Sequence, residues 1–404
     1  MSIPHELSAI DNPKTSAVSP YAWVILTVAL LAGIAAPLNQ SKVPPLMPVL
    51  IDQFHLNLGS AGLLMSIFAI TGFILALPAG VILQKLGPKI TGLIAVGFLM
   101  VGSAIGALST SAGLMFFSRL IEGAGMGLIA VVAPAVIASW FPPEKRGTPM
   151  GIWATWVPLG NLIMFNVAPA LGTAYGWQAV WWAGAAFALV AFILYALLIR
   201  LPVGERSDET AGPAPDLRKA LANRNIWLLA LSFGCLNLVM VGAIGTYYPT
   251  FLSTQRGFSL AGAASIASLS LPVGIILSPI FGWLTDRAGK RKPFILISFA
   301  VMAVWMAFPF SISSAFIPAL LLAMGVISAV IPTATFSAAP EVMNNPQLAG
   351  IGLAVIILWQ NLGQLLGPMI FGPLVESIGW VAAGYWMIPG LLVAFVAIWL
   401  TRMR

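Results

Sequence analysis

Long apolar runs recur along the whole chain, and they limit its fold more than any other feature of the sequence. Each run has about 20 residues or more, which is enough for an α-helix to cross a hydrocarbon layer roughly 30 Å thick. Only 8% of the residues are charged and the mean hydropathy is +0.97, whereas soluble domains carry charge at about a quarter of their positions. A water-soluble fold would lack the polar side chains to cover its surface, so the chain is predicted to be an all-α membrane protein.

Twelve such runs can be separated, and each is expected to form one transmembrane helix. No stretch alternates between polar and apolar residues with a two-residue period, which argues against a membrane β-barrel. Several runs are longer than a straight crossing requires, so tilted helices or extensions into the aqueous layers are expected. The runs cover residues 21–50, 58–84, 89–108, 112–139, 147–170, 177–200, 225–252, 259–284, 293–312, 314–340, 347–375 and 379–402.

Two polar segments divide the chain. Residues 1–20 are expected to form a cytoplasmic tail, and the apolar run that follows continues past any small-residue cleavage signal, which argues against a removed signal peptide. Residues 201–224 hold the one long polar stretch in the interior of the sequence and are predicted to be a cytoplasmic linker. They separate a predicted six-helix bundle at 21–200 from a second one at 225–402.

The two halves of the sequence repeat each other. The loop Gly282–Lys292 reads GWLTDRAGKRK, and a degraded copy, GVILQKLGPKI, lies 202 residues earlier at Gly80–Ile90. Five further matches share an offset of 203 residues, which is hard to obtain by chance: Gly147 with Gly350, Trp156 with Trp359, Gly160 with Gly363, Asn161 with Gln364, and Gly176–Trp177 with Gly379–Trp380. Parallel six-helix halves are a transporter architecture, in which the substrate site lies between the halves near mid-membrane.

The basic residues are distributed unequally between the two sides of the membrane. If the N-terminus is inside, 16 of the 19 lysines and arginines fall on the cytoplasmic side and Arg256 alone falls outside, while Lys42 and Arg119 lie within runs. By the positive-inside rule both termini are expected to be cytoplasmic. This distribution also explains the net charge of +7 without a nucleic-acid partner. The expected location is the plasma membrane, which in a bacterium is the inner membrane.

Several short motifs make the chain resemble the major facilitator superfamily of transporters over essentially its full length. The loop at Gly282–Lys292 fits the superfamily's loop signature, and its first-half copy keeps Gly80, Gly87 and Lys89 but has Gln84 where an acid is expected. The other motifs are Arg119-x-x-x-Gly123-x-Gly125 in the fourth run and the turn Pro143-Glu144-x-Arg146-Gly147. The resemblance implies two pseudo-symmetric bundles of six transmembrane helices each, transport by alternating access, and a monomer.

The loop motifs are predicted to form gates. Asp286 ends the eighth run, and pseudo-symmetry places it near Gly147 at the start of the fifth, where a carboxylate meets free N–H groups and the positive end of a helix dipole. Such a contact would hold the inside gate shut in the outward-open state; alternatively the basic loop only fixes topology, and both can be true. Gln84 carries no charge, so a weaker latch is expected in the first-half loop. The predicted gating residues are Asp286, Arg287, Arg291, Gln84, Lys89, Arg146 and Glu144.

Lys42 is the most informative single residue, because it lies in the outer half of the first run. An ammonium group in an apolar layer is costly unless it faces a cavity or a partner. The family resemblance adds that branches carrying small anions, such as cyanate-type and organic-anion symporters, often have a basic residue here. Lys42, with Asn39 and Gln40, is therefore predicted to bind substrate. The alternative is a lysine that snorkels to the outer headgroups.

Arg119 and Glu122 form a second candidate in the fourth run. At about 1.5 Å per residue, Arg119 lies roughly 11 Å deep, and the three-residue spacing allows the two side chains to pair. Either they neutralise each other as a structural pair, or Arg119 binds an anionic group while Glu122 exchanges protons. The second six runs hold no charged residue at comparable depth, so charge recognition is expected in the first half.

The second half is expected to contribute shape and hydrogen bonds. Trp156 and Trp359 are equivalent by pseudo-symmetry and are predicted to line the cavity, with simple packing as an equal alternative. The other predicted substrate contacts are polar or aromatic side chains: Asn161, Asn237, Tyr247, Tyr248, Gln360, Asn361 and Gln364.

These features predict a secondary active transporter for a small anionic solute, moved with protons by alternating access. The alternative is proton-driven efflux of amphipathic drugs, which would tolerate Lys42→Ala. An enzyme is not expected, because one Arg–Glu pair and one lysine make no nucleophile–base or metal constellation, and a receptor would need a longer soluble segment. No cofactor is predicted: there is no phosphate-binding loop ending in Gly-Lys-Ser/Thr, and Cys235, His5 and His55 show no metal-ligand spacing.

Overall fold

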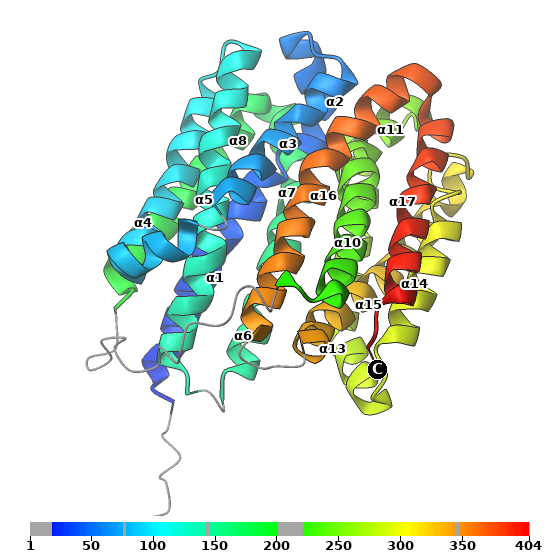
Figure 1. Ribbon diagram of the computed structural model, residues 1–404. Helices are drawn as coiled ribbons and strands as arrows, with labels where there is room; N and C mark the ends of the chain where they lie inside the picture. The colour runs from blue at the N-terminus through cyan, green and yellow to red at the C-terminus, as the bar shows by residue number, and fades with distance from the viewer. Residues whose placement is uncertain (1–17, 76–77, 143–144, 201–220, 344–347, 404) are drawn as a thin grey trace, which may run out of the picture.

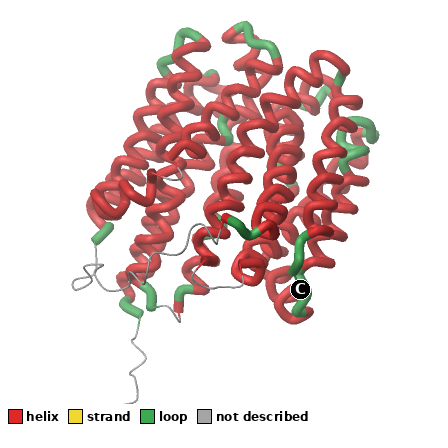
Figure 2. The backbone as a smooth tube through the Cα atoms, in the orientation of Figure 1, coloured by secondary structure: helices red, strands yellow, loops and turns green. Residues whose placement is uncertain are grey.

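The computed structural model describes residues 18–75, 78–142, 145–200, 221–343 and 348–403 (Figure 1). Every regular element in these ranges is helical, as Figure 2 shows. Eleven helical segments of the described chain are long and apolar enough to span a membrane, and a shorter apolar helix lies at Lys292–Trp305. The chain is an integral membrane protein, and its all-α architecture confirms the prediction from the apolar runs.

The described helices follow the order of the apolar runs. In the first half they are α1 (Pro20–Gln40), α2 (Val43–Phe54), α3 (Leu58–Leu75), α4 (Pro78–Ala107), α5 (Ala112–Trp140), α6 (Gly147–Trp153), α7 (Trp156–Tyr175) and α8 (Trp177–Leu198). In the second half they are α10 (Arg224–Val239), a π-helical turn (Met240–Gly245), α11 (Thr246–Arg256), α12 (Leu260–Ala267), α13 (Ser270–Ala288), α14 (Lys292–Trp305), a 3₁₀ turn (Ser314–Phe316), α15 (Ile317–Met343), α16 (Ala349–Ile378) and α17 (Trp380–Leu400).

Several runs differ from the single helices predicted for them. The first divides into α1 and α2, the fifth into α6 and α7, and the eighth into α12 and α13. α4 begins within the second predicted run and continues through the third, interrupted at Gly87, where φ is 74° and ψ is 164°. A side chain would strain the backbone at this φ, so glycine suits this turn of the loop copy. The ninth run is a helix only over Lys292–Trp305, and turns occupy most of its remainder.

The two halves of the chain lie side by side (Figure 1). In the first half α4 packs against α5 and α8, and in the second α10 packs against α16 and α17. Between the halves, α3 runs along α16, and α7 packs on α12 and α13. We call the end that carries the C-terminus the proximal end and the opposite end, where α2 meets α3 and α16 meets α17, the distal end.

The internal repeat is also present in the packing. An added Cβ at Gly160 of α7 would lie 2.9 Å from the backbone nitrogen of Leu38 in α1. At the offset of 203, a Cβ at Gly363 of α16 would lie 2.9 Å from the backbone nitrogen of Leu238 in α10. Small residues at both crossings let the helices approach closely. Positions 38 and 238 are therefore equivalent, which gives an offset of 200 for the first helix of each half.

The first helix of each half is irregular at the same place. α1 ends at Gln40, a two-residue turn follows, and α2 begins at Val43. α10 passes through the π-helical turn Met240–Gly245 before α11 begins. The offset of 200 superposes these two irregularities. Broken helices of this kind form substrate sites in transporters built from repeats, and π-helical turns are frequent at functional sites.

Candidate functional site

Three charged side chains meet inside the first half and form what we call the charged cluster: Lys42, Arg119 and Glu122. Lys42 Nζ lies 2.6 Å from Glu122 Oε1, and Arg119 Nη1 lies 2.5 Å from Glu122 Oε2. All three side chains have an exposed fraction of 0%. One carboxylate therefore serves two cations, and two positive charges against one negative charge leave a net charge of +1 when all are ionised.

The ammonium group of Lys42 uses all three of its N–H donors. Besides Glu122, it donates to Asn39 Oδ1 and Ser103 Oγ, both at 2.8 Å. Ser103 in turn donates to the backbone carbonyl of Trp181 at 2.6 Å. Lys42 Nζ also lies 4.7 Å from the centre of the Trp181 ring, which is within cation–π range. Hydrogen bonds and an aromatic face thus offset the loss of water around the ammonium.

Arg119 binds the broken end of α1. Pro44 has no N–H, so the carbonyl of Gln40, four residues earlier, lacks its helical donor. Arg119 Nη2 donates to this carbonyl at 3.1 Å, and Nη1 donates to the carbonyl of Asn39 at 2.8 Å. Its Nε donates to the carbonyl of Leu64 in α3 at 3.0 Å. The guanidinium also faces the negative end of the α1 dipole, so the proline that breaks the first run creates the acceptor that holds Arg119.

Glycines on α4 and α8 make room for this arrangement. A Cβ at Gly102 would lie 2.7 Å from Glu122 Cγ, and a Cβ at Gly184 would lie 2.5 Å from Asn39 Oδ1. Both distances are too short for carbon contacts, so a larger residue at either position would displace a member of the cluster or its partner.

Part of this arrangement follows the sequence predictions. Arg119 and Glu122 pair, as their spacing predicts. Lys42 is fully buried and bonded to Glu122, so the alternative of a lysine snorkelling to the headgroups is wrong for this conformation. The roles of these residues toward a substrate and a proton stay predictions.

The sequence analysis did not predict the pairing of Lys42 with Glu122. It also did not predict that Lys42 contacts Ser103 and Trp181. Lys42 and Glu122 are 80 positions apart, so no local spacing connects them. One signal exists: Glu122 is the one acid within the predicted runs of the first half, and a buried lysine needs an anionic partner. Nothing comparable marks Ser103 among the serines of the chain.

Each half also has a polar pair beside its irregular first helix. Ser41 Oγ donates to Asn161 Oδ1 at 2.7 Å, and Gln364 Nε2 donates to Asn237 Oδ1 at 3.3 Å. Asn161 and Gln364 are equivalent at the offset of 203 and are both half-buried. The structure therefore brings two of the predicted amides, Asn237 and Gln364, together in the second half, while Asn161 in the first half bonds to the hydroxyl of Ser41.

Trp156 and Trp359, which were predicted to line the cavity, are half-buried, and each also packs against a neighbouring residue. Trp156 stacks on Trp153, with ring centres 4.9 Å apart and planes inclined by 14°. Trp359 lies against Gly234, where a Cβ would be 3.0 Å from the indole ring. Trp156, Trp359 and the neighbouring Gln360 all keep part of their surface exposed, so a place in the cavity wall stays a prediction.

The two tyrosines of α11 lie elsewhere. Tyr247 is fully buried, and its hydroxyl lies 2.9 Å from the carbonyl of Leu58 in α3 and 3.0 Å from that of Pro368 in α16. The structure thus places it at the junction of the two halves. Tyr248 donates to the carbonyl of Pro309 at 2.9 Å, within the second half.

Three of the predicted gating residues make contacts inside their own half. Arg291 Nη1 lies 3.0 Å from Glu341 Oε2, and Arg146 Nε donates to the carbonyl of Phe141 at 2.8 Å. The guanidinium of Arg287 lies 5.3 Å from the centre of a tryptophan ring on its own helix. These contacts neither require nor exclude a gate.

The other predicted gating residues give less information. Gln84 is exposed and Lys89 is half-buried on the loop copy within α4. Glu144 and the side chain of Asp286 lie outside what the structure describes. The predicted contact between Asp286 and the start of the fifth run therefore stays a prediction.

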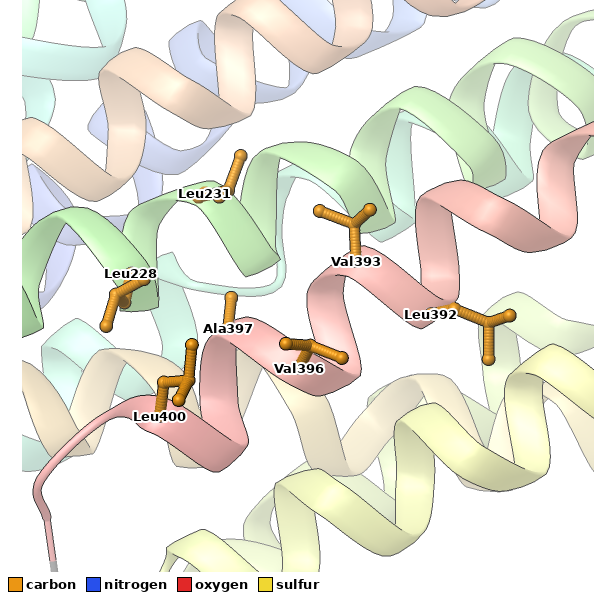
Figure 3. A pocket seen from close by; sticks show the side chains of 7 residues that line it. All are labelled: Leu228, Leu231, Leu392, Val393, Val396, Ala397 and Leu400. Atoms are coloured by element: carbon orange, nitrogen blue, oxygen red, sulfur yellow. The ribbon is translucent and has the colours of Figure 1, made fainter.

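An apolar pocket of about 330 Å³ opens between α10 and α17 (Figure 3). Leucine, valine and alanine side chains form its whole lining: Leu228, Leu231, Leu392, Val393, Val396, Ala397 and Leu400. Leu392 and Val393 are each about half exposed, at 50% and 49%. Binding sites fix a solute with a few placed polar groups, which the lining of this pocket lacks, so we do not propose it as the solute site.

The sequence profile of the Major Facilitator Superfamily matches residues 29–276 and 252–404. The chain belongs to this superfamily. The match covers nearly all of the described helices and confirms the resemblance inferred from the loop and helix motifs.

The relatives of this chain are named as transporters of organic solutes or as drug-resistance proteins. The chain is 22% identical over 394 residues to the "Hexuronate transporter" of Bacillus subtilis, covering 91% of this chain and 92% of the relative. It is 26% identical over 396 residues to the "Phosphoglycerate transporter protein" of Salmonella typhimurium, covering 88% and 83%. It is also 23% identical over 381 residues to "Multidrug resistance protein 2" of Bacillus subtilis, covering 90% and 93%.

Solved structures show the same fold. A bacterial homolog to the human lysosomal transporter Spinster, in an inward-facing and unoccupied conformation, superposes with a TM-score of 0.78 at 18% sequence identity. The superposition covers 95% of this chain and 98% of the other. These structures show the superfamily's fold, and the family match makes the chain a membrane transporter rather than an enzyme.

Proposed function

We propose that this chain is a secondary active transporter that moves a small anionic solute together with protons, by alternating access of its two halves. The observation that carries the proposal is the net positive charge of the charged cluster, which has two cations and one carboxylate at an exposed fraction of 0%. A net charge buried at membrane depth is costly without a further partner. An anionic solute is the partner that would cancel it.

The first half would supply this charge recognition. In the described part of the second half, the fully buried polar residues are uncharged. Gly242 stands at the position equivalent to Lys42 and packs against Gly367 of α16. The second half would instead offer the half-buried amide of Gln364, paired with Asn237, as a neutral hydrogen-bonding surface.

The relatives support an anionic substrate class. Hexuronate and phosphoglycerate are organic anions, and they appear in the names of two relatives that align with more than four-fifths of this chain. These names belong to those proteins. For this chain they support the class of solute rather than its identity.

Glu122 is the proposed proton carrier. Its two carboxylate oxygens each accept a hydrogen bond from a cation of the cluster. Protonation would remove the negative charge and free one N–H of Lys42 and one of Arg119 for an anion. A proton and an anion would then bind more favourably together than either would alone, which is the requirement for symport.

The charge distribution supports an orientation with the proximal end and both termini in the cytoplasm. In this orientation the distal end, where α2 meets α3 and α16 meets α17, faces outward. We place the protein in the plasma membrane, where it would act as a monomer.

Efflux of amphipathic drugs is the second candidate, because "Multidrug resistance protein 2" is a relative of similar coverage. The half-buried rings of Trp156 and Trp359 would suit a loose apolar cavity. This function would not need the positive charge of Lys42.

Ligand-induced thermal stabilisation of the purified protein distinguishes the two functions. The panel contains uronates, phosphoglycerates, sulfonates and inorganic anions on one side and lipophilic cations on the other. Wild type is compared with Lys42→Gln and with the control Arg256→Gln, which removes a basic residue bonded to backbone carbonyls at the distal end.

We expect an anion to raise the unfolding temperature of wild type and of Arg256→Gln, and to lose this effect in Lys42→Gln. Stabilisation by lipophilic cations that persists in Lys42→Gln would contradict the anion proposal and favour drug efflux.

A further inference from the structure

A second polar arrangement joins the two halves at the distal end, around the start of α3. Glu376 of α16 accepts hydrogen bonds from the N–H of Leu58 at 2.5 Å and from that of Gly59 at 3.3 Å. α3 begins at Leu58, so these N–H groups have no acceptor within their own helix. A carboxylate of the second half therefore caps a helix of the first half and faces the positive end of its dipole.

The same residue of α3 is held from another side. The hydroxyl of Tyr247 lies 2.9 Å from the carbonyl of Leu58 and 3.0 Å from that of Pro368. The backbones are so close that a Cβ at Gly372 would lie 2.8 Å from the Leu58 carbonyl oxygen. The second half thus binds both the N–H and the C=O of Leu58. Neither bond can persist once α3 and α16 separate at this end.

Serine side chains also join the two halves, at positions that the internal repeat relates. Ser66 of α3 donates to the carbonyl of Leu365 in α16 at 2.7 Å. Its equivalent at the offset of 202, Ser268, accepts a hydrogen bond from Asn166 Nδ2 of α7 at 3.3 Å. Ser265 of α12 also bonds to this asparagine and donates to Asn166 Oδ1 at 3.0 Å. Serine side chains of each half therefore bond to a helix of the other half, and Ser66 and Ser268 do so at equivalent positions.

Glu376 breaks this symmetry. The equivalent residue at the offset of 203 is Thr173, whose hydroxyl donates to Pro169 of its own helix at 2.7 Å. Both equivalent helix starts have a local cap: Asn57 accepts from the N–H of Ser60 in α3, and Ser259 accepts from the N–H of Gly262 in α12. The carboxylate of Glu376 is thus an additional cap on α3 that comes from the other half, and the threonine at its equivalent position bonds within its own helix instead.

We propose that Glu376 is the latch of the distal gate, a positioning residue that holds α3 against α16 and must release Leu58 each time this end opens. The hydroxyl of Tyr247 holds the same residue by a second contact, at the carbonyl of Leu58. The latch acts on the equilibrium between the closed and open forms of the distal end. The contact forms without a solute, whatever solute the chain carries.

The test measures how fast a buried reporter cysteine reacts. Cys235→Ser removes the single native cysteine, and Ser66→Cys places a thiol at a position that is 1% exposed at the junction. Opening of the distal end uncovers this position, so the rate of alkylation by a water-soluble maleimide follows the open fraction. Purified protein in detergent is used, and gel filtration and the unfolding temperature verify that each variant is folded.

Glu376→Gln, made in this reporter background, is expected to raise the alkylation rate about two- to fivefold, the range given by the loss of an exposed carboxylate from a helix start. Glu376→Asp should give an intermediate rate, because it keeps the charge on a shorter side chain. Tyr247→Phe should also raise the alkylation rate, because it removes the hydroxyl that contacts the carbonyl of Leu58. The matched control is Thr173→Val, which removes the equivalent polar group and should leave the rate unchanged.

If Glu376→Gln and Tyr247→Phe both react at the rate of the Thr173→Val control, the latch proposal is wrong. The assay needs no solute, so its outcome is independent of the anion screen. A chain that lacks the latch can still carry an anion, and a chain that exports drugs can still have the latch.

Discussion

Removing the carboxylate of Glu122 is the sharpest perturbation of the charged cluster. Glu122→Gln keeps the shape of the side chain but leaves Lys42 and Arg119 as two fully buried cations without an anion, a net charge of +2. Removing one partner of a buried ion pair costs about 3–5 kcal/mol. Asn39 and Ser103 still accept hydrogen bonds from the ammonium. We therefore expect a loss near the lower end of that range, about 3 kcal/mol in the free energy of unfolding.

Lys42→Met is the matched comparison, because it changes the net charge in the opposite direction. It removes one cation, keeps the pair between Arg119 and Glu122, and brings the cluster from +1 to 0. Apolar replacement of a buried ion is often neutral or stabilising, while each lost hydrogen bond costs about 1 kcal/mol. The expected loss is about 1–2 kcal/mol, smaller than for Glu122→Gln. The double variant should be more stable than Glu122→Gln alone.

Equilibrium unfolding of the purified protein in a mixed-micelle titration, followed by tryptophan fluorescence, measures these differences, and the 14 tryptophans of the chain provide the signal. The order of the two single variants is the decisive result. If Lys42→Met loses as much stability as Glu122→Gln, the cluster is not short of negative charge, and the physical argument for an anionic solute fails.

Three further predictions concern the same region. In proteoliposomes, Glu122→Gln should abolish solute accumulation driven by a pH gradient while solute exchange at equal pH continues; retained accumulation would rule out Glu122 as the proton carrier. Gly184→Ala should lower the free energy of unfolding by about 1–3 kcal/mol, because the added Cβ crowds Asn39, which accepts a hydrogen bond from Lys42. The control is Gly113→Ala, whose added Cβ meets no atom within 4 Å. It should leave the stability measured by thermal unfolding nearly unchanged. Pro44→Ala returns an N–H that competes with Arg119 for the freed carbonyl of α1, so stabilisation by the anion should weaken severalfold while the protein stays folded; an unchanged dose–response curve would contradict this.

The architecture could be predicted from the sequence because it depends on patterns that repeat along the chain. Hydrophobic runs give the number and length of the crossings, and the offset between pairs such as Trp156 and Trp359 gives the two halves. Local spacing also sufficed for the pair of Arg119 and Glu122, since residues three apart lie on one face of a helix. These signals all act within one helix or recur at a fixed interval.

The partners of the charged cluster and the distal latch could not be predicted in the same way. Lys42 meets Glu122 and Ser103 only because three helices pack together, and no spacing in the sequence encodes that contact. Glu376 is one exposed acid at the end of a run, and its role depends on how the halves are tilted. The sequence did predict the right type of contact, in which a carboxylate of one half binds a helix start of the other half. The prediction named Asp286 at the proximal end, whereas the contact in the described residues is made by Glu376 at the distal end.

One helix, α3, touches both the charged cluster and the distal latch. Arg119 donates to the carbonyl of Leu64 in α3, and Glu376 caps the same helix at Leu58. The two points are six residues apart, a rise of roughly 9 Å along the helix, so a shift of α3 at one point moves the other. A change in the partners of Arg119, such as protonation of Glu122, alters the forces on α3 less than two turns from the latch. Coupling between two sites requires a physical element whose position both sites bias. On the proposed function, α3 is that element, and it would link the charge state of the cluster to the opening of the distal end.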